Sequence, residues 1–147
     1  MSITRTAAEA GILAQLIALI PQMAATSSIM HYLDKPEQMT GQQIQQKHSR
    51  GVLLVQYDES EGSGLTETMI LSVICIAFTP QKVIKLGDAV REALNNWQIP
   101  GATRIELHDD KPSGYEAGLY SRTVRFRCNT PAVSSQDRAA AIAAMNL

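Results

Sequence analysis

The stretch MILSVICIAFTPQKVIKLGDAVREAL, residues 69–94, decides the fold. Its first part belongs to a run, Thr66 to Phe78, in which both alternating sets of residues are almost wholly apolar. That pattern is typical of a strand covered on both faces, by helices on one and by a second layer or another subunit on the other. Thr79 and Pro80 then supply an N-cap and a first-turn proline for a helix. Apolar residues spaced by three and four predict its buried stripe, which is Val83, Leu86, Val90, Leu94 and Trp97.

A β-hairpin is expected immediately before this helix. Gly51 to Tyr57 is rich in branched residues and predicts one strand, and the run from Thr66 predicts the strand that returns beside it. Between them, Asp58 to Gly64 reads DESEGSG, which is the composition of a flexible turn. The sequence therefore predicts an exposed acidic hairpin tip that carries Asp58, Glu59 and Glu61.

The N-terminal segment predicts a helix from Ala7 to Ile20. Thr6 and Glu9 have the spacing of a capping box, and Pro21 ends the helix. Its apolar residues cover several sides, so this helix needs more than one neighbour. The expected buried stripe is Ile12, Leu16, Leu19 and Ile20, widened by Leu13 and Ile17. Residues 22–50 have no clear period and are expected to be irregular, with at most a short helical turn.

Two more strands are predicted after the central helix. Ala102 to His108 alternates, with Ile105 and Leu107 inward, and a polar, acidic turn is expected over Asp109 to Gly118. The last strand lies near Leu119 to Cys128. One of its faces carries Val124, Phe126 and Cys128, and the other carries Thr123, Arg125 and Arg127, while Arg122 fits either face.

Together these elements predict an α+β domain. An antiparallel or mixed sheet of about four strands packs against the N-terminal helix and the central amphipathic helix. No linker or repeat divides residues 1–147, so a single domain is expected. Its alanine-rich tail, residues 130–147, includes a short helix over Gln136 to Met145.

Charge and cysteine content narrow the possible environments. The net charge is −1, so no overall field favours direct binding to nucleic acid or to an anionic membrane. Only 18% of residues are charged, which favours an oligomer over a free monomer. Gly11 to Ile20 is too short to cross a bilayer, so a cytoplasmic protein is expected. Cys75 and Cys128 lie in apolar runs and are expected to be buried thiols, with a disulfide between neighbouring strands as the alternative.

Catalytic patterns are absent from the sequence. No serine lies in a G-x-S-x-G motif, and neither cysteine has a neighbouring base. Glu106, His108 and Asp110 fall at alternate positions of a predicted strand and offer mixed ligands for a divalent ion. A solvated strand face explains the same three residues, so we expect no catalytic residue, no metal and no cofactor.

The outward arginines suggest a surface for pairing between subunits, although a plain solvated sheet face explains them equally well. Arg104, Arg122, Arg125 and Arg127 lie near Asp109, Asp110 and Glu116 in the predicted strands and turn. Exposed ion pairs contribute only about 0 to 1 kcal/mol, so their better use is in register and specificity. We expect that reversing Arg125 and Arg127 to Glu leaves folding nearly intact but weakens assembly.

The succession of these elements resembles a known family. An N-terminal helix and an acidic hairpin are followed by TMILSVICIAFTP (68–80), KVIKLGDAVREAL (82–94) and IPGATRIELHDDKPSGYEAGLYSRTVRFRC (99–128). This order is similar to that of small tail-assembly proteins from Mu-like bacteriophages and prophages, specifically their tail terminator class. The resemblance covers Gly51 to Cys128 and includes a G-Y-E-x-G-L-Y turn that begins at Gly114.

The resemblance implies a structural, non-enzymatic protein. Members of the class form hexameric rings that cap the tail tube, end its polymerisation and offer a docking face to the neck. The implied partners are other copies of the chain, the tail tube protein, the sheath where the tail is contractile, and neck or connector proteins. The implied location is the host cytoplasm during assembly and then the head-proximal end of the virion tail. The expected contact residues are Asp58, Glu59, Glu61, Arg104, Asp109, Asp110, Tyr115, Arg125 and Arg127.

Two other readings stay open. Another head-to-tail connector or completion protein shares the small size and the ring assembly. A small enzyme, or a ligand- or metal-binding α+β domain, would instead use the face of Glu106, His108 and Asp110.

Overall fold

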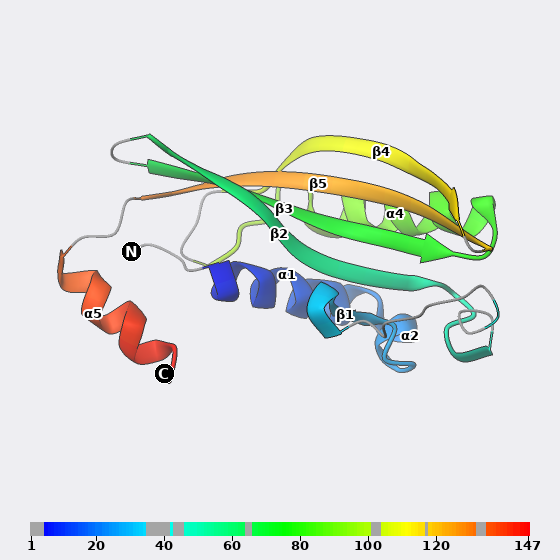
Figure 1. Ribbon diagram of the computed structural model, residues 1–147, viewed down its shortest axis with the longest axis horizontal. Coiled ribbons are helices and arrows are strands. Elements are labelled where there is room, and N and C mark those ends of the chain that lie inside the picture. The colour runs from blue at the N-terminus through cyan, green and yellow to red at the C-terminus, as the bar shows by residue number, and fades with distance from the viewer. Residues whose placement is uncertain are drawn as a thin grey trace.

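One mixed sheet organises the chain in the computed structural model, which describes residues 5–34, 42, 46–63, 66–100, 104–116, 118–131 and 135–147. Its five strands lie in the order β1-β2-β3-β5-β4 (Figure 1). β1 runs parallel to β2, and the other pairs are antiparallel. The strands are β1 (Ile29–His31), β2 (Val52–Ser63), β3 (Thr66–Ala77), β4 (Glu106–Glu116) and β5 (Leu119–Pro131). The predicted α+β class with a mixed sheet is confirmed.

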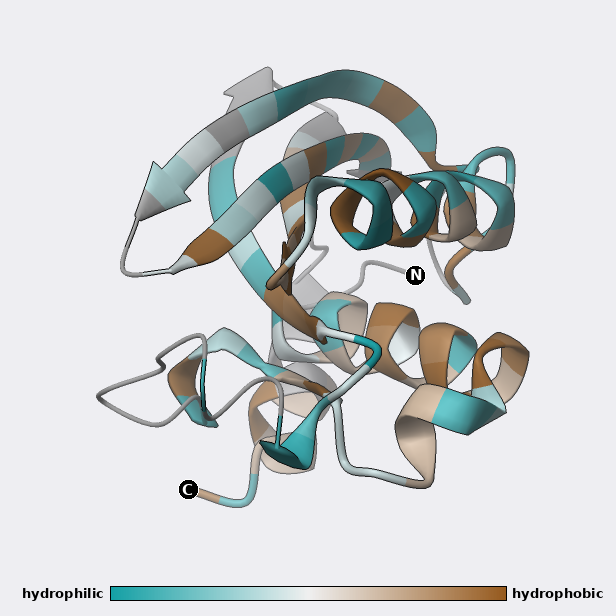
Figure 2. Ribbon diagram, turned by 90° about the vertical axis from the view of Figure 1, so that its right-hand side faces the viewer, coloured by the Kyte–Doolittle hydropathy of each residue, from teal (hydrophilic) through white to brown (hydrophobic). Residues whose placement is uncertain are grey.

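Two long helices cover one face of this sheet. They lie on the same side of it in Figure 2, and their buried residues share one core with the inward residues of β2, β3 and β5. The helical segments are α1 (Arg5–Leu19), α2 (Pro21–Ala24), α4 (Pro80–Leu94), α5 (Ser135–Ala144) and the short 3₁₀ turn η1 (Tyr32–Asp34). No helix in the described part of the chain is long and apolar enough to cross a membrane.

The central helix follows its sequence pattern closely. The Thr79 hydroxyl accepts a hydrogen bond from the Lys82 backbone N–H at 3.3 Å, which caps α4. The predicted stripe is buried, except that Trp97 lies beyond the end of the helix and packs at the margin of the core. Buried members of the shared core include Ile12, Leu16, Val73, Leu94, Val124 and Phe126.

The opposite face of β3 contributes to a second, smaller apolar cluster. Val52 and Leu54 of β2 are fully buried there, and Ile74 and Ile76 of β3 pack beside them. Since neighbouring residues of a strand point to opposite faces, these side chains lie on the side away from α1 and α4. Ile74 and Ile76 are only partly buried, so helices cover one face of β3, and the second layer or subunit that the sequence predicts on its other face stays a prediction.

The predicted start and buried stripe of the first helix were partly wrong. α1 already includes Arg5, so Thr6 lies inside the helix and is not its N-cap. The Glu9 carboxylate instead accepts hydrogen bonds from Arg5 and His31, which hold it buried between α1 and β1. Leu19 is exposed, because the sheet and α4 cover only the side of α1 that carries the buried core residues.

Part of the region expected to be irregular is ordered. α2 follows Pro21, and β1 then adds a parallel edge strand in which Ile29 pairs with Leu53. A three-residue strand is too short to produce a recognisable alternation, which is why the sequence pattern missed it. The rest of the predicted loop, residues 35–41 and 43–45, lies outside the described residues.

Most of each predicted acidic turn is strand instead, although Gly118 does lie in a turn and Gly64 is outside the described residues. β2 continues to Ser63 opposite β3, and β4 continues to Glu116 opposite β5. A β-bulge interrupts the pairing of β2 after Tyr57, and two more interrupt β4. Bulges admit polar residues that break the alternation without ending the strand, so the composition of a turn was misleading here.

The strand predicted over Ala102 to His108 begins only at Glu106, as β4, whereas two further local predictions are confirmed. α5 forms close to its predicted position, and each of its side chains that the structure describes is exposed. Cys75 and Cys128 are both free and buried, so the alternative of a disulfide is wrong. Burial raises the pKa of Cys75 to about 12 and that of Cys128 to about 11, which keeps both thiols protonated and unreactive.

Candidate assembly surface

Six charged side chains form two parallel rows on the face of the sheet that α1 and α4 leave uncovered. In the first row, the strand register brings Arg125 of β5 opposite Asp109 of β4 and Ser72 of β3. In the second, Arg127 lies opposite Glu106 and Ile70, with Glu59 beyond Ile70. We call this group the sheet patch: Asp58, Glu59, Glu106, Asp109, Arg125 and Arg127.

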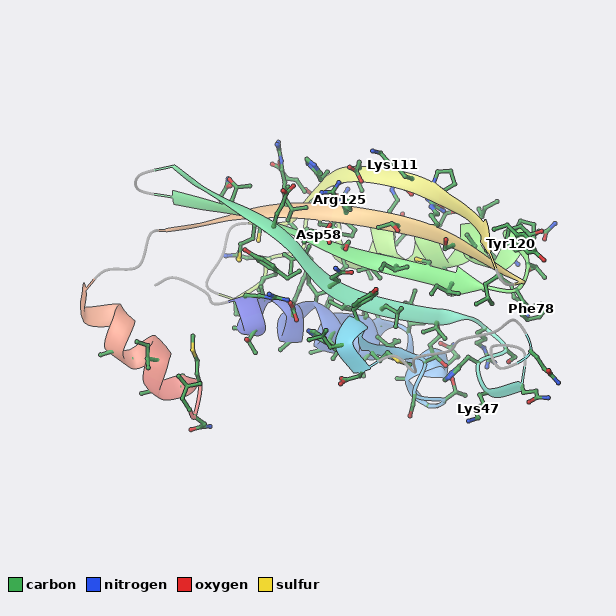
Figure 3. The ribbon with its side chains drawn as sticks, in the orientation of Figure 1. Lys47, Asp58, Phe78, Lys111, Tyr120 and Arg125 are labelled. Carbon is green, nitrogen blue, oxygen red and sulfur yellow. The ribbon has the colours of Figure 1, made fainter. Side chains whose placement is uncertain are left out.

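Arg125 is the centre of the sheet patch. Its Nε donates to Asp58 Oδ2 at 3.0 Å and its Nη1 to Asp109 Oδ2 at 3.1 Å. Its Nη2 reaches Glu59 Oε1 at 3.5 Å. The Ser72 hydroxyl holds the other oxygen of Asp58 at 2.9 Å. Figure 3 shows Asp58 and Arg125 close together in the middle of the sheet, so one guanidinium joins strands β2, β5 and β4.

The second row is looser. Arg127 Nη2 lies 3.2 Å from Glu106 Oε2, and both side chains are more than half exposed (54% and 61%). An exposed pair of this kind contributes little to stability. Four carboxylates and two guanidinium groups give the sheet patch a net charge of −2. Within the described residues, the buried Oδ1 of Asp109 has no hydrogen-bond partner.

Two β-bulges create the sheet patch. Without them, consecutive residues Asp58 and Glu59 would point to opposite faces, and so would Glu106 and Asp109. One extra residue is inserted in β2 between Tyr57 and Glu59, and one in β4 between Leu107 and Asp109. Each insertion shifts the alternation of side chains by one position. Both pairs of carboxylates therefore reach the same face.

The bulge in β4 also separates the candidate metal ligands. Glu106 pairs with Arg127 on the uncovered face, whereas Asp110 pairs with Arg122 on the helix side. No group of three or more His, Cys, Asp and Glu side chains in the described ranges could hold a metal ion. The proposed set of Glu106, His108 and Asp110 is therefore not assembled.

A second charged group lies on the helix side and joins α4 to the sheet. Arg122 donates to Asp110 Oδ1 at 2.7 Å and Oδ2 at 2.5 Å, and also to the Ile84 carbonyl at 2.8 Å. Asp88 of α4 lies 3.4 Å away. The hydrogen bond from Arg122 lowers the pKa of the Asp110 carboxyl and raises the pKa of Arg122, because each partner stabilises the charge of the other. Arg122 thus shares the face of Val124.

Gly87 makes room for this contact. A Cβ at residue 87 would overlap the Arg122 guanidinium. We expect Gly87→Ala to lower the free energy of unfolding by about 1 kcal/mol, because losing charge-assisted hydrogen bonds outweighs the gain in helix propensity. In an Arg122→Ala background the same change should be stabilising, by about 0.5 to 1 kcal/mol. Urea denaturation of the four proteins in this cycle checks the reversal of sign; destabilisation in both backgrounds would contradict it.

The other predicted contact residues lie outside the sheet patch. Arg104 donates to the Asn96 carbonyl at 2.6 Å, next to the end of α4. Tyr115 is 63% exposed and packs against Tyr120 near the β4–β5 turn, with 4.7 Å between the ring centroids and 47° between the ring planes. Glu61 lies in β2, and its side chain is outside the described residues. Sequence reasoning missed the ion pair of Glu106 with Arg127 because it depends on the register between β4 and β5, which neither strand's own sequence fixes.

The fold is similar to that of a chain of a solved virion. Over 84% of this chain and 93% of the other, the fold matches a chain of the structure described as "Virion of native gene transfer agent (GTA) particle", with a TM-score of 0.60. At 14% sequence identity, the likeness is one of fold. No family model and no curated protein sequence matches the chain.

Proposed function

We propose that this chain is a structural protein of a phage-like virion. The observation that carries this proposal is the match of nearly the whole fold to a chain of a gene transfer agent virion. The order of elements independently resembles that of phage tail terminator proteins. We infer that the chain forms a ring at the head-proximal end of a tail, ends polymerisation of the tube, and provides the face on which the neck docks.

A surface that carries a local charged patch, on a chain whose net charge is close to zero, suits this role. The sheet patch is displayed on a rigid sheet, and the net charge of the whole chain is only −1. A ring built from one kind of chain needs two different, complementary surfaces on each copy, because only a head-to-tail contact can close into a ring of more than two. We infer that the partners are other copies of the chain, the tail tube protein, a sheath where one exists, and neck proteins. Assembly would take place in the host cytoplasm.

Another head-to-tail connector is the second candidate, because the description of the matched particle names a virion and no position within it. The two roles predict different defects in tails that are assembled without the chain. Loss of a terminator leaves tubes of uncontrolled length, whereas loss of a connector leaves tubes of normal length that do not join heads.

The mass of the purified chain in solution is the first test. We expect concentration-dependent assembly into a closed ring, measured by native mass spectrometry and sedimentation, with no change on adding Mg²⁺ or Zn²⁺. A chain that stays monomeric at all concentrations and also when mixed with its tail tubes would contradict a ring-forming role.

A further inference from the structure

Four basic residues belong to the two segments that meet where α4 begins, which are residues 46–50 and the first turns of α4. The Lys82 ammonium donates to the Ser49 carbonyl at 2.6 Å and lies 4.0 Å from the centre of the Phe78 ring. These contacts hold the segment around Ser49 against the start of α4. Lys85 follows one helical turn later and is exposed. We call the group the basic corner: Lys47, Arg50, Lys82 and Lys85.

The basic corner has no acidic partner among the residues that the structure describes. None of its four side chains takes part in an ion pair with any residue that the structure describes. The start of α4 adds the partial positive charge of a helix N-terminus. A chain with a net charge of −1 therefore carries four positive charges without a described ion-pair partner on one part of its surface and an excess of negative charge on another.

The two charged surfaces lie apart on the molecule. In Figure 3, Lys47 and Phe78 are toward one end, whereas Asp58 and Arg125 are in the middle of the sheet. The basic corner includes the start of α4, and α4 covers the face of the sheet opposite the sheet patch. Since neither surface can reach the other within one chain, their complementary charges can meet only between copies.

We propose that the basic corner of one copy docks on the sheet patch of the next copy. This inference rests on the proposed ring and names the interface that closes it. The contact is head-to-tail, as a ring requires. In the sheet patch, Glu59 and Glu106 are the accessible carboxylates, with 55% and 61% of their side chains exposed. Complementary charge of this kind fixes register and speeds association.

Two charge-reversed variants test the interface. The first carries Glu59→Lys with Glu106→Lys, which changes the net charge of the sheet patch from −2 to +2, because two carboxylates become two ammonium groups. The second carries Lys47→Glu, Arg50→Glu and Lys85→Glu, which changes the net charge of the basic corner from +4 to −2, because three cations become three carboxylates and Lys82 remains. All five side chains are exposed, so the melting temperature should change little. The matched controls are Glu92→Lys and Glu92→Gln, which reverse or remove an exposed charge of α4 outside both surfaces.

Each variant alone should repel its own copies. We expect at least about a tenfold loss in association, measured by sedimentation and by the number of copies retained at tail ends. An equal mixture of the two variants should assemble again, because each altered surface then meets an altered surface of opposite sign. Rings restored in this way alternate the two chains and contain an even number of copies. The controls should assemble like the unmodified chain.

The outcomes separate the interface from the function. If the unmodified chain assembles and both variants also assemble alone, the interface lies elsewhere while the ring stands. If each variant fails alone and the mixture fails too, the two surfaces do not pair with each other. If the unmodified chain assembles neither in solution nor on tails, the proposed function fails and the interface fails with it.

Discussion

Replacing Phe126 by alanine is expected to lower the free energy of unfolding by about 3 to 5 kcal/mol. Phe126 is among the largest fully buried side chains of the protein. It lies in β5 between Leu71 of β3 and Leu107 of β4, on the face that α1 and α4 cover. The well-ordered strands on both sides cannot collapse into the space that its ring leaves. The loss therefore combines the transfer of the ring to water with the cost of a cavity.

Chemical denaturation followed by circular dichroism measures this loss. Phe126→Leu is the matched control, since it keeps most of the buried volume and should cost much less than Phe126→Ala. Ile84→Ala is the control for position, because Ile84 is an apolar residue of α4 that is 55% exposed. A Phe126→Ala protein as stable as the Ile84→Ala protein would contradict the assignment of the core.

Reversing Arg125 to Glu is expected to lower the free energy of unfolding by about 1 to 3 kcal/mol. The structure thus revises the expectation that both Arg125 and Arg127 can be reversed without affecting the fold. Only 26% of the Arg125 side chain is exposed, and three carboxylates surround it. Replacing the guanidinium by a fourth carboxylate would eliminate all of its hydrogen bonds and would add repulsion among like charges.

Arg127→Glu is the matched control for this prediction. Arg127 is 54% exposed and pairs with Glu106 alone, so its reversal should change the free energy of unfolding by less than about 1 kcal/mol. Thermal melts of both variants at low and high salt measure the difference. Added salt should recover part of the loss in Arg125→Glu, because it screens the repulsion. Equal melting temperatures for the two variants would show that Arg125 does not hold the strands together.

The parts of the fold that sequence predicted well depend on local signals. The helix from Pro80 has a capping threonine, a first-turn proline and an apolar stripe within one segment, and each is recognisable without knowledge of the rest of the chain. β5 likewise alternates without interruption from Thr123 to Cys128, so its inward and outward residues were predicted correctly. Strong periodicity over a long element is the most reliable sequence signal.

The errors arose where distant partners decide the structure. Asp58 and Glu59 look like turn residues, but β3 and Arg125 hold them in a strand. The same holds for Asp109, which Arg125 anchors from β5. Whether Glu106 and Asp110 share a face depends on a bulge, and a one-residue shift reverses the answer. The presence of a charged surface could be predicted from the sequence, but the residues that form it could not.

The length of tails made without this chain tests the central claim most directly. Tails assembled from the same genome, with and without the chain, are compared by electron microscopy for tube length and attachment to heads. A ring that caps the tube predicts tubes of variable, extended length without heads when the chain is missing, and restored length when it is supplied. Tubes of normal, uniform length joined to heads in its absence would contradict the terminator role.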